Sequence, residues 1–460
     1  MNLKRICADF FRGGLRPDPG LFGKESLKMK ATALQQTIRD GGYDAVFAGL
    51  YGKGRVETQR ARYARLLDGF LAVYGDREAA LFSVPGRTEV SGNHTDHQHG
   101  RVLAAAVDID IIAAASPTDE GVVRLKSEGY SEDVTDIRRP DAKACRRGTS
   151  SALIAGVCAA FEAAGRKTGG FCAYTMSDVL TGSGLSSSAA FEVMLGNILS
   201  HFYNEGRVPA VELAKSGKYA ENEFFGKPCG LMDQAACAVG GFAYMDFASA
   251  AEPEIEKLSL ELGGRMLCIV NTGGNHADLT DDYASIPAEM KAVAAVFGKN
   301  CLREVDEAAF YASLPALRET CGDRAVLRAI HFFAENERVY AQRACIRAGD
   351  TEGFLSLVRE SGDSSFKYLQ NIYTVKNVGE QGLSLALALC GRLGAVCRVH
   401  GGGFAGTVQA YVEKSRAEVF RDTLSAVFGE SACLFLSFRP YGAVRVEQTR
   451  ILEGETAFDV

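Results

Sequence analysis

A glycine- and serine-rich stretch near the middle of the chain constrains the fold more than any other feature of the sequence. It reads Val179-Leu-Thr-Gly-Ser-Gly-Leu-Ser-Ser-Ser-Ala-Ala-Phe-Glu192. The residues before it, 171–176, mix aromatic, β-branched and small side chains, as a buried strand does. The apolar residues after it recur at the spacing of one helical face, at Phe191, Met194, Leu195, Ile198, Leu199 and Phe202. The stretch therefore predicts a strand, a glycine loop and a helix in succession.

The glycine loop has the chemistry of an anion-binding site. Gly182 and Gly184 let the backbone approach a ligand closely, because glycine has no side chain in the way. Ser186, Ser187 and Ser188 stand where the first N–H groups of the helix lack partners within it. Those N–H groups and the helix dipole favour negative charge, such as the phosphates of a nucleotide. The loop is not a Walker A loop, since no Gly-Lys-Ser/Thr follows at the required spacing. A serine-rich helix cap without a ligand is the alternative.

Length and composition exclude several classes of protein. The chain has 460 residues, which predicts two domains, and its net charge of −6 gives no support for nucleic-acid binding. The apolar run 102–115 is interrupted by Asp108 and Asp110, so it is not a transmembrane helix. The thirteen cysteines include no CxxC pair, which favours free thiols in a reducing compartment over zinc ligation. We therefore expect a cytoplasmic protein that binds neither nucleic acid nor membrane, of open oligomeric state.

One basic cluster needs its own explanation, because clustered positive charge can mark a partner site. It consists of Arg138, Arg139, Lys143, Arg146 and Arg147. A solvated loop or helix face explains it better than a binding site.

The order of the expected elements favours an α+β class, because strands and helices do not alternate regularly. The expected strands cover 80–84, 102–115, 122–125, 171–176, 242–247, 266–271, 398–400, 408–412 and 434–438. The expected helices cover 57–74, 151–164, 211–225 and 416–428, with a mostly helical region up to 393. We expect an N-terminal extension of unknown role (1–55), a first domain (56–250) and a second domain (251–460).

Two further stretches concentrate polar chemistry. The segment 85–100 lies between two expected strands and carries Arg87, Glu89, Asn93, His94, Asp96, His97 and His99. Such a segment is either a site lined by hydrogen-bonding groups or an exposed loop, and its histidines form no clear tetrahedral zinc set. Asp233 follows Gly230 at an expected helix start. It either stabilises the helix dipole or faces a pocket as a general base.

Together these stretches resemble the GHMP kinases, and within them the galactokinases. Residues 85–100 are similar to the sugar signature of that family, and 182–188 to its phosphate-binding motif. Residues 228–234 are similar to the segment with the catalytic aspartate, and Gly401–Gly406 to the third, glycine-rich motif. The motifs follow the family's order between about residues 56 and 440. The resemblance implies a two-domain GHMP kinase fold, with a cleft between the domains where ATP and Mg²⁺ phosphorylate a sugar at its anomeric hydroxyl.

The resemblance also implies a role for each matched residue. Asp233 would be the general base, and Arg87 would stabilise the anionic aspartate and the charge that develops on the transferred phosphoryl group. The ligands of Mg²⁺ would be Ser188 and Glu221. The residues around the ATP phosphates would be Gly182, Ser183, Gly184, Leu185, Ser186, Ser187 and Ser188. The residues around the sugar would be Asn93, His94, Thr95, Asp96, Gly230 and Tyr283.

Three positions depart from the family pattern. The sugar signature reads Gly92-Asn-His-Thr-Asp-His97, with Asn93 where glutamate is usual. Leu180 replaces a proline of the phosphate motif, and His400 replaces a threonine before the third motif, neither in direct contact with the expected chemistry. The neutral Asn93 can pair with galactose, the leading substrate, and would not repel the carboxylate of galacturonate, the alternative.

A third interpretation belongs to another class of protein, a catalytically silent sugar sensor on the same fold. The retained Arg87, Ser188, Glu221 and Asp233 argue against it, because a sensor needs no base. Galacturonate has one further point in its favour, since plant galacturonokinases share an Asp-His-Gln run such as Asp96-His97-Gln98.

Overall fold

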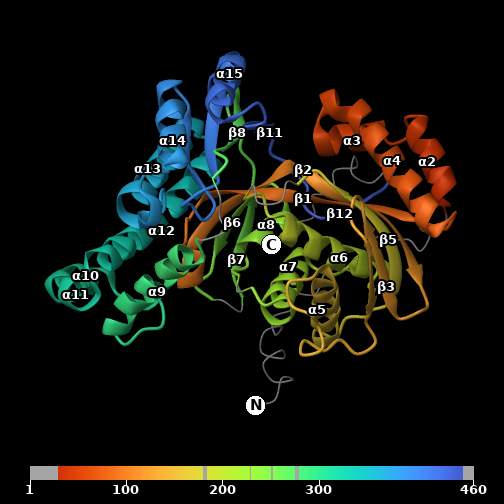
Figure 1. Ribbon diagram of the computed structural model, residues 1–460, viewed down its shortest axis with the longest axis horizontal. Helices are drawn as coiled ribbons and strands as arrows, with labels where there is room; N and C mark the ends of the chain where they lie inside the picture. Colours follow the sequence, from red (N-terminus) through yellow and green to blue (C-terminus); the bar gives the residue numbers. More distant parts are fainter. Residues whose placement is uncertain (1–28, 180–183, 228, 250–251, 275–278, 449–460) are drawn as a thin grey trace.

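Two β-sheets, each with its own helices, divide the protein into two lobes (Figure 1). The computed structural model describes residues 29–179, 184–227, 229–249, 252–274 and 279–448. One sheet has eight strands in mixed orientation, and the other has four antiparallel strands. The expected two-domain α+β class is therefore confirmed.

The larger sheet is built around its longest strand, β2, which pairs with β1 along one side and with β5 and β6 along the other. Its strands are β1 (Ala80–Ser91), β2 (Arg101–Thr118), β3 (Val122–Ser127), β4 (Glu132–Asp136), β5 (Gly170–Ser177), β6 (Phe242–Asp246), β7 (Glu254–Leu258) and β12 (Val444–Val446). The helical segments of the same lobe are α2 (Ala31–Arg39), α3 (Asp44–Tyr51), η1 (Lys53–Arg55), α4 (Val56–Tyr74), η2 (Asp96–Gln98), α5 (Ser150–Ala163), α6 (Ser187–Tyr203), α7 (Ala210–Tyr219), η3 (Ala220–Phe225) and α8 (Met232–Val239).

Helices cover both faces of this sheet, which explains why β1 and β2 are buried along nearly their whole length. Successive side chains of a strand point to opposite faces. Phe82 and Val84 therefore join the core under α6 and α8, whereas Leu81 joins the core under α2, α3 and α4. Figure 1 shows the two groups of helices on opposite sides of the long strands.

The smaller sheet and a group of helices form the second lobe. Its strands are in the order β11-β8-β10-β9, and they are β8 (Arg265–Asn271), β9 (Val396–His400), β10 (Thr407–Glu413) and β11 (Cys433–Leu436). Its helical segments are α9 (Thr280–Val296), η4 (Leu302–Glu304), α10 (Glu307–Ala312), α11 (Leu314–Cys321), α12 (Asp323–Ala348), α13 (Thr351–Ser364), η5 (Ser365–Leu369), η6 (Val375–Asn377), α14 (Gly382–Arg392), η7 (Lys414–Arg416) and α15 (Ala417–Phe428).

The boundaries of the two lobes differ from the domain boundaries expected at residues 55 and 250. The helices α2 and α3 pack with α4 in one core against the larger sheet, so residues 31–51 are an integral part of the first lobe. The strands β7 and β12 also belong to the larger sheet, although both come after residue 250. The chain therefore passes into the second lobe and returns to the first.

Strand β1 is longer than the expected 80–84, and this changes the position of two site residues. It continues to Ser91 through irregularities between Pro85 and Arg87 and between Glu89 and Ser91. Arg87 and Glu89 therefore lie on a buried strand, not in the polar loop where the sequence placed them. A β-bulge redirects a side chain in this way and is common beside active sites.

Two other findings concern the exclusions drawn from composition. No helix in the described part of the chain is both long and apolar enough to cross a membrane. The cysteines of the described residues, from Cys145 to Cys433, are free thiols.

Candidate active site

Three segments far apart in the sequence meet at the carboxylate of Asp233. Asp233 lies in the first turn of α8, and its Oδ1 accepts a hydrogen bond of 2.8 Å from Arg87 Nε on β1. Arg87 Nη2 lies 2.7 Å from the same oxygen. Ser186, which precedes α6, donates to Asp233 Oδ2 at 2.7 Å. The Asp233 side chain keeps 36% of its surface exposed, whereas Arg87 is buried, so the carboxylate is open to a ligand from one side.

Electrostatics keep Asp233 in the form that a base requires. Burial raises the pKa of the carboxyl, but the charge of Arg87 and the hydrogen bonds from Ser186 and Arg87 outweigh burial and lower the pKa below its usual range. Burial lowers the pKa of Arg87, but the charge of Asp233, the hydrogen bond to Asp233 and the charge of Glu89 together raise the pKa above its usual value. The pair is therefore ionised at neutral pH.

The described part of the glycine loop is attached to β1 through its carbonyl groups. Leu185 O accepts a hydrogen bond of 3.1 Å from Arg87 N, and Gly184 O accepts one from Arg87 Nη1. Gly184 has φ +72°, a conformation that suits glycine. Of the residues expected around the phosphates, Gly182 and Ser183 lie outside the described residues. Ser187 and Ser188 begin α6, whose N-terminal N–H groups are suited to an anion.

His400 lies closer to this loop than the sequence indicated. A Cβ added to Gly184 would be 3.1 Å from His400 Nδ1, so the imidazole packs directly behind the loop. Its ring nitrogens lie 3.0 Å from Thr88 Oγ1 on β1 and 3.0 Å from Thr407 Oγ1 on β10. Burial, followed by the charges of Arg87 and Arg398, holds the pKa of His400 well below its ordinary value. A neutral histidine thus joins the two lobes behind the phosphate loop.

The two expected magnesium ligands lie side by side. Ser188 Oγ is 3.4 Å from Glu221 Oε1, and Glu221 also accepts from Lys227 Nζ at 2.9 Å and from Gln234 Nε2 at 3.0 Å. Nearby Glu192 is buried, its Oε1 has no partner among the described groups, and burial followed by Glu221 raises its pKa well above normal.

These oxygens fit Mg²⁺, which prefers hard oxygen donors and shares them with phosphates and water. The described residues contain no group of three or more His, Cys, Asp or Glu side chains that could hold a metal ion by themselves. The site would therefore depend on the nucleotide phosphates to complete the coordination of the ion.

Four of the expected sugar-binding residues surround the same site. Asp96 Oδ2 lies so close to Gly230 that a Cβ there would overlap it, which explains why a glycine stands at this position. His94 Nε2 is 3.0 Å from Gly402 O, and Tyr283 donates to Gly403 O at 2.8 Å. The second glycine loop therefore holds His94 and Tyr283.

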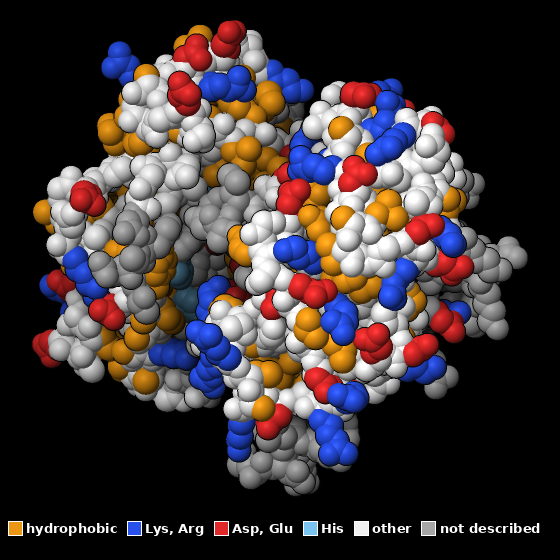
Figure 2. Space-filling model, turned by 45° about the vertical axis from the view of Figure 1, so that its right-hand side comes forward, with side chains coloured by type: hydrophobic (Ala, Val, Ile, Leu, Met, Phe, Trp, Pro, Cys, Tyr) orange, Lys and Arg blue, Asp and Glu red, His pale blue; other side chains and the backbone are white. Residues whose placement is uncertain are grey.

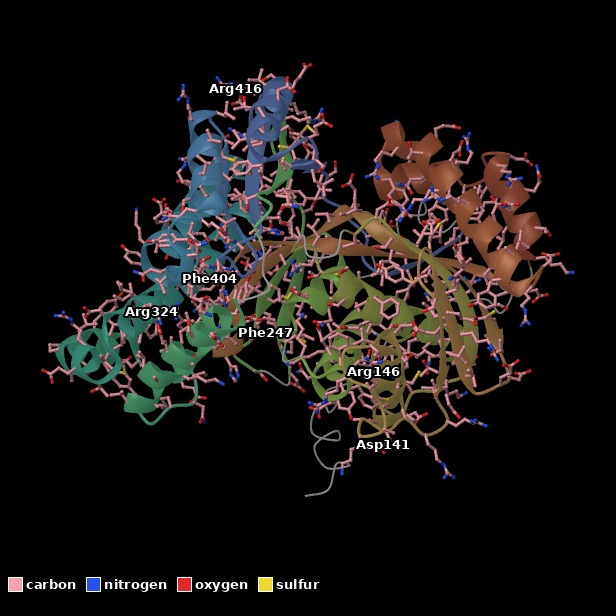
Figure 3. All side chains as sticks on the ribbon, viewed as in Figure 1. Asp141, Arg146, Phe247, Arg324, Phe404 and Arg416 are labelled. Atoms are coloured by element: carbon pink, nitrogen blue, oxygen red, sulfur yellow. The ribbon has the colours of Figure 1, made fainter. Side chains whose placement is uncertain are left out.

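The space-filling view shows a hollow between the lobes, with histidine side chains inside it and Lys and Arg side chains near its rim (Figure 2). Phe404, whose ring packs edge-on against Tyr283, lies among the helices of the second lobe (Figure 3).

The basic cluster of the first lobe is separate from this hollow. Arg146 and Asp141 lie well away from Phe404, beside α5. In the same basic region Arg138 pairs with Asp136 on the surface, in keeping with a solvated cluster.

The other two expected sugar-binding residues, Asn93 and Thr95, have buried side chains. Asn93 is 1% exposed, and its Nδ2 donates to Glu89 Oε1 at 2.8 Å and to Gly401 O at 2.7 Å. Its Oδ1 accepts from Asn371 Nδ2 at 2.7 Å. Thr95 is fully buried, and its hydroxyl bonds the backbone of its own loop. Both side chains bond to protein partners in this structure, and their contact with a sugar stays a prediction.

The environment of Asn93 predicts the outcome of Asn93→Glu. A carboxylate would face the Glu89 carboxylate and Gly401 O in a buried site, so we expect the free energy of unfolding to fall by more than about 3 kcal/mol. The variant should lose activity toward galactose and galacturonate alike, as urea unfolding and initial rates with both sugars would show. Asn377→Glu makes the same exchange at an exposed position and should change neither quantity. A stable Asn93→Glu variant that discriminates between the two sugars would place the side chain against the substrate after all.

Several residues of the site escaped the sequence reasoning. The bond from Ser186 to Asp233 joins two motifs that are 47 residues apart, and no local pattern predicts it. Lys227 has a weak signal, because it stands in the run 226–234 that carries Asp233, but its pairing with Glu221 depends on the π-helix η3.

Comparisons with known proteins agree with this geometry. Two family models match, the GHMP kinases N terminal domain over residues 151–241 and the galactokinase galactose-binding signature over residues 68–117. A galactokinase from Streptomyces coelicolor is 31% identical over 365 residues, which cover 78% of this chain and 91% of that protein. The chain belongs to the galactokinase family. A galactokinase from Streptococcus suis is 30% identical over 373 residues, 80% of this chain and 93% of that protein.

Solved structures show that this galactokinase-family chain also has the GHMP kinase fold. Lactococcus lactis galactokinase complexed with galactose aligns with a TM-score of 0.72 and 24% identity, over 84% of this chain and 100% of that one. A mevalonate kinase aligns with a TM-score of 0.55 and 15% identity, over 78% of this chain and 99% of that one. The relatives and solved structures thus cover most of the chain.

Proposed function

We propose that this member of the galactokinase family transfers the γ-phosphoryl group of ATP to the anomeric hydroxyl of galactose, yielding galactose 1-phosphate and ADP. The observation that carries the proposal is the ionised Asp233, fixed by Arg87 and Ser186 beside the phosphate loop and partly exposed. A positioned carboxylate next to an anion site is the arrangement that phosphoryl transfer to a hydroxyl requires.

In this mechanism Asp233 takes the proton of the sugar hydroxyl while the oxygen attacks the γ-phosphorus. Arg87 orients the carboxylate and, as a buried cation, offsets the negative charge of the reacting groups. The N-terminal N–H groups of α6 hold the phosphates. Ser188 and Glu221 would hold Mg²⁺, which would supply positive charge next to the phosphates.

His94, Asp96, Gly230 and Tyr283 would position the sugar, since each is only partly buried. Burial raises the pKa of Asp96, as does the nearby charge of Asp233, whereas His94 lowers it. The neighbouring His97 has its pKa lowered to about 3 by burial and by the charges of His94 and Lys291, so it remains neutral.

The proposal is tested by mixing the purified protein with Mg-ATP and a panel of sugars and following ADP release. The panel contains galactose, glucose, galacturonate and glucuronate, with Asp233→Asn protein as the control for background hydrolysis. Turnover fastest with galactose supports the proposal, and faster turnover with galacturonate overturns the choice of substrate. Sugar binding without turnover of any sugar would instead support a sensor.

A second test addresses the metal. Ser188→Ala removes one of the two paired oxygens, so we expect the Mg²⁺ concentration for half-maximal rate to rise on the order of tenfold. The KM for galactose should change little, because Ser188 lies at the phosphate end of the site. Ser187→Ala is the matched control in the same turn and should leave the Mg²⁺ requirement near wild type. A larger effect of Ser188→Ala on the galactose KM than on Mg²⁺ would contradict the assignment.

A further inference from the structure

Ser186 has an unusual conformation for a residue at the start of a helix. It is the N-cap of α6, but its φ of +61° and ψ of +55° lie in the left-handed region, which is strained for a residue with a side chain. An N-cap serine normally accepts a hydrogen bond from the first turn of its helix, and the Ser186 side chain makes no such bond. Both features are unfavourable for the local structure, so they require another explanation.

The explanation lies in the partner of the Ser186 hydroxyl. It donates to Asp233 Oδ2, whereas both short contacts from Arg87 go to Oδ1. The two oxygens of the base are thus held by different elements, Oδ1 by the buried strand β1 and Oδ2 by the phosphate loop. Because Arg87 occupies Oδ1, a sugar hydroxyl would have to approach Oδ2, the oxygen that Ser186 holds.

We propose that Ser186 is a positioning residue that couples the two substrates, because its hydroxyl holds Asp233 Oδ2 in the nucleotide-free protein and turns to the phosphates when ATP occupies the loop. This inference rests on the proposed function. The required movement is one side-chain rotation, since the hydroxyl already lies at the N-terminus of the helix that would receive the phosphates.

The coupling follows from the hydrogen bond itself. A donor to a carboxylate stabilises its charged form and lowers its affinity for a proton. When the hydroxyl of Ser186 leaves, Oδ2 becomes both free for the sugar and more basic. By linkage, ATP then tightens galactose binding by the same factor as galactose tightens ATP binding, on the order of tenfold. The other charged or titratable groups that face Asp233 stay in place: Arg87, Asp96, Glu192, Lys227, Cys229 and Cys237.

The test measures galactose affinity by calorimetry, with and without a non-hydrolysable ATP analogue and Mg²⁺. Wild-type protein should bind galactose on the order of tenfold more tightly when the analogue is present. Ser186→Ala and Ser186→Gly should bind it tightly without the analogue and show no further gain. Ser186→Gly relieves the left-handed strain, so it separates loss of the hydroxyl from damage to the loop. Ser415→Ala, at an exposed position in η7 outside the site, should retain the wild-type coupling.

A pH profile supplies a readout that a merely structural role would not change. The pH profile of the rate with both substrates far below their KM values reports the free enzyme, in which Ser186 still donates to Oδ2. Removing a donor to the charged carboxylate raises the pKa of Asp233, so the acid limb should move to higher pH in both Ser186 variants and stay in place in Ser415→Ala. Wild-type coupling in Ser186→Gly, or an unmoved acid limb, overturns the inference, as does the absence of coupling in an active wild-type enzyme. If the wild-type protein turns over no sugar, that result contradicts the proposed function.

Discussion

Asp233→Asn is expected to lower kcat by about 10²–10⁴-fold, because the amide keeps the shape of the side chain but cannot take the proton of the sugar hydroxyl. ATP should still bind, since Arg87 N donates to Leu185 O through a backbone bond between β1 and the loop that the substitution leaves intact. Initial rates with galactose and calorimetry with an ATP analogue measure the two quantities. A kcat near that of the wild type would remove Asp233 from the mechanism.

The variant needs a control for the loss of an ion pair, because Arg87 is buried and would lose its charged partner. Asp246→Asn is the matched exchange outside the site, since Asp246 is partnered at 2.9 Å by both Arg101 and Arg303. We expect Asp246→Asn to lower the urea midpoint but to leave kcat near that of the wild type. If both variants lose kcat equally, general destabilisation explains the effect of Asp233→Asn.

Asp110→Asn is expected to lower the free energy of unfolding by about 3–5 kcal/mol, the cost of leaving buried charges without their partner. Asp110 is fully buried on β2, where it accepts from Arg62 at 2.6 Å, Arg439 at 2.9 Å and Tyr51 at 2.6 Å. It therefore connects α3, α4 and the segment before β12 to the larger sheet. Urea unfolding followed by circular dichroism measures the change.

Asp136→Asn is the matched control, because Asp136 also pairs with an arginine but does so at the surface. Exposed pairs contribute little to stability, so its unfolding midpoint should equal that of the wild type. Equal midpoints for the Asp110 and Asp136 variants would mean that the buried cluster does not hold the N-terminal helices in place.

The sequence placed the motifs well, because each depends on local rules. The glycine loop before α6, the strand β5 and the helix α5 are visible from spacing and composition, since turn residues and periodic apolar positions act over a few residues. The family resemblance added the association of Asp233 with Arg87, which the structure shows as a direct contact. The short strands β4, β7 and β12 were missed, because they depend on their neighbours in the sheet more than on their own pattern.

The hydrogen-bond partners of Asn93 could not be predicted from the local sequence. The motif placed it beside the sugar, but its amide group is shared by Glu89 and by Asn371, which is 278 residues away. No pattern in the signature reports a partner at that distance. Replacing Asn93 would therefore also change a buried hydrogen-bond network.

The sequence by itself determined the class of the protein, the order of its motifs and the residue types that its chemistry needs, since hydrophobic periodicity and glycine loops are properties of short segments. Only the tertiary structure decided which of those residues meet. Ser186 donates a hydrogen bond to Asp233, and His400 packs behind the phosphate loop. Asp110 accepts a hydrogen bond from Arg439, which is 329 residues away in the sequence. The reason is physical: the state of a buried polar group depends on its partners, and folding brings those partners from anywhere in the chain.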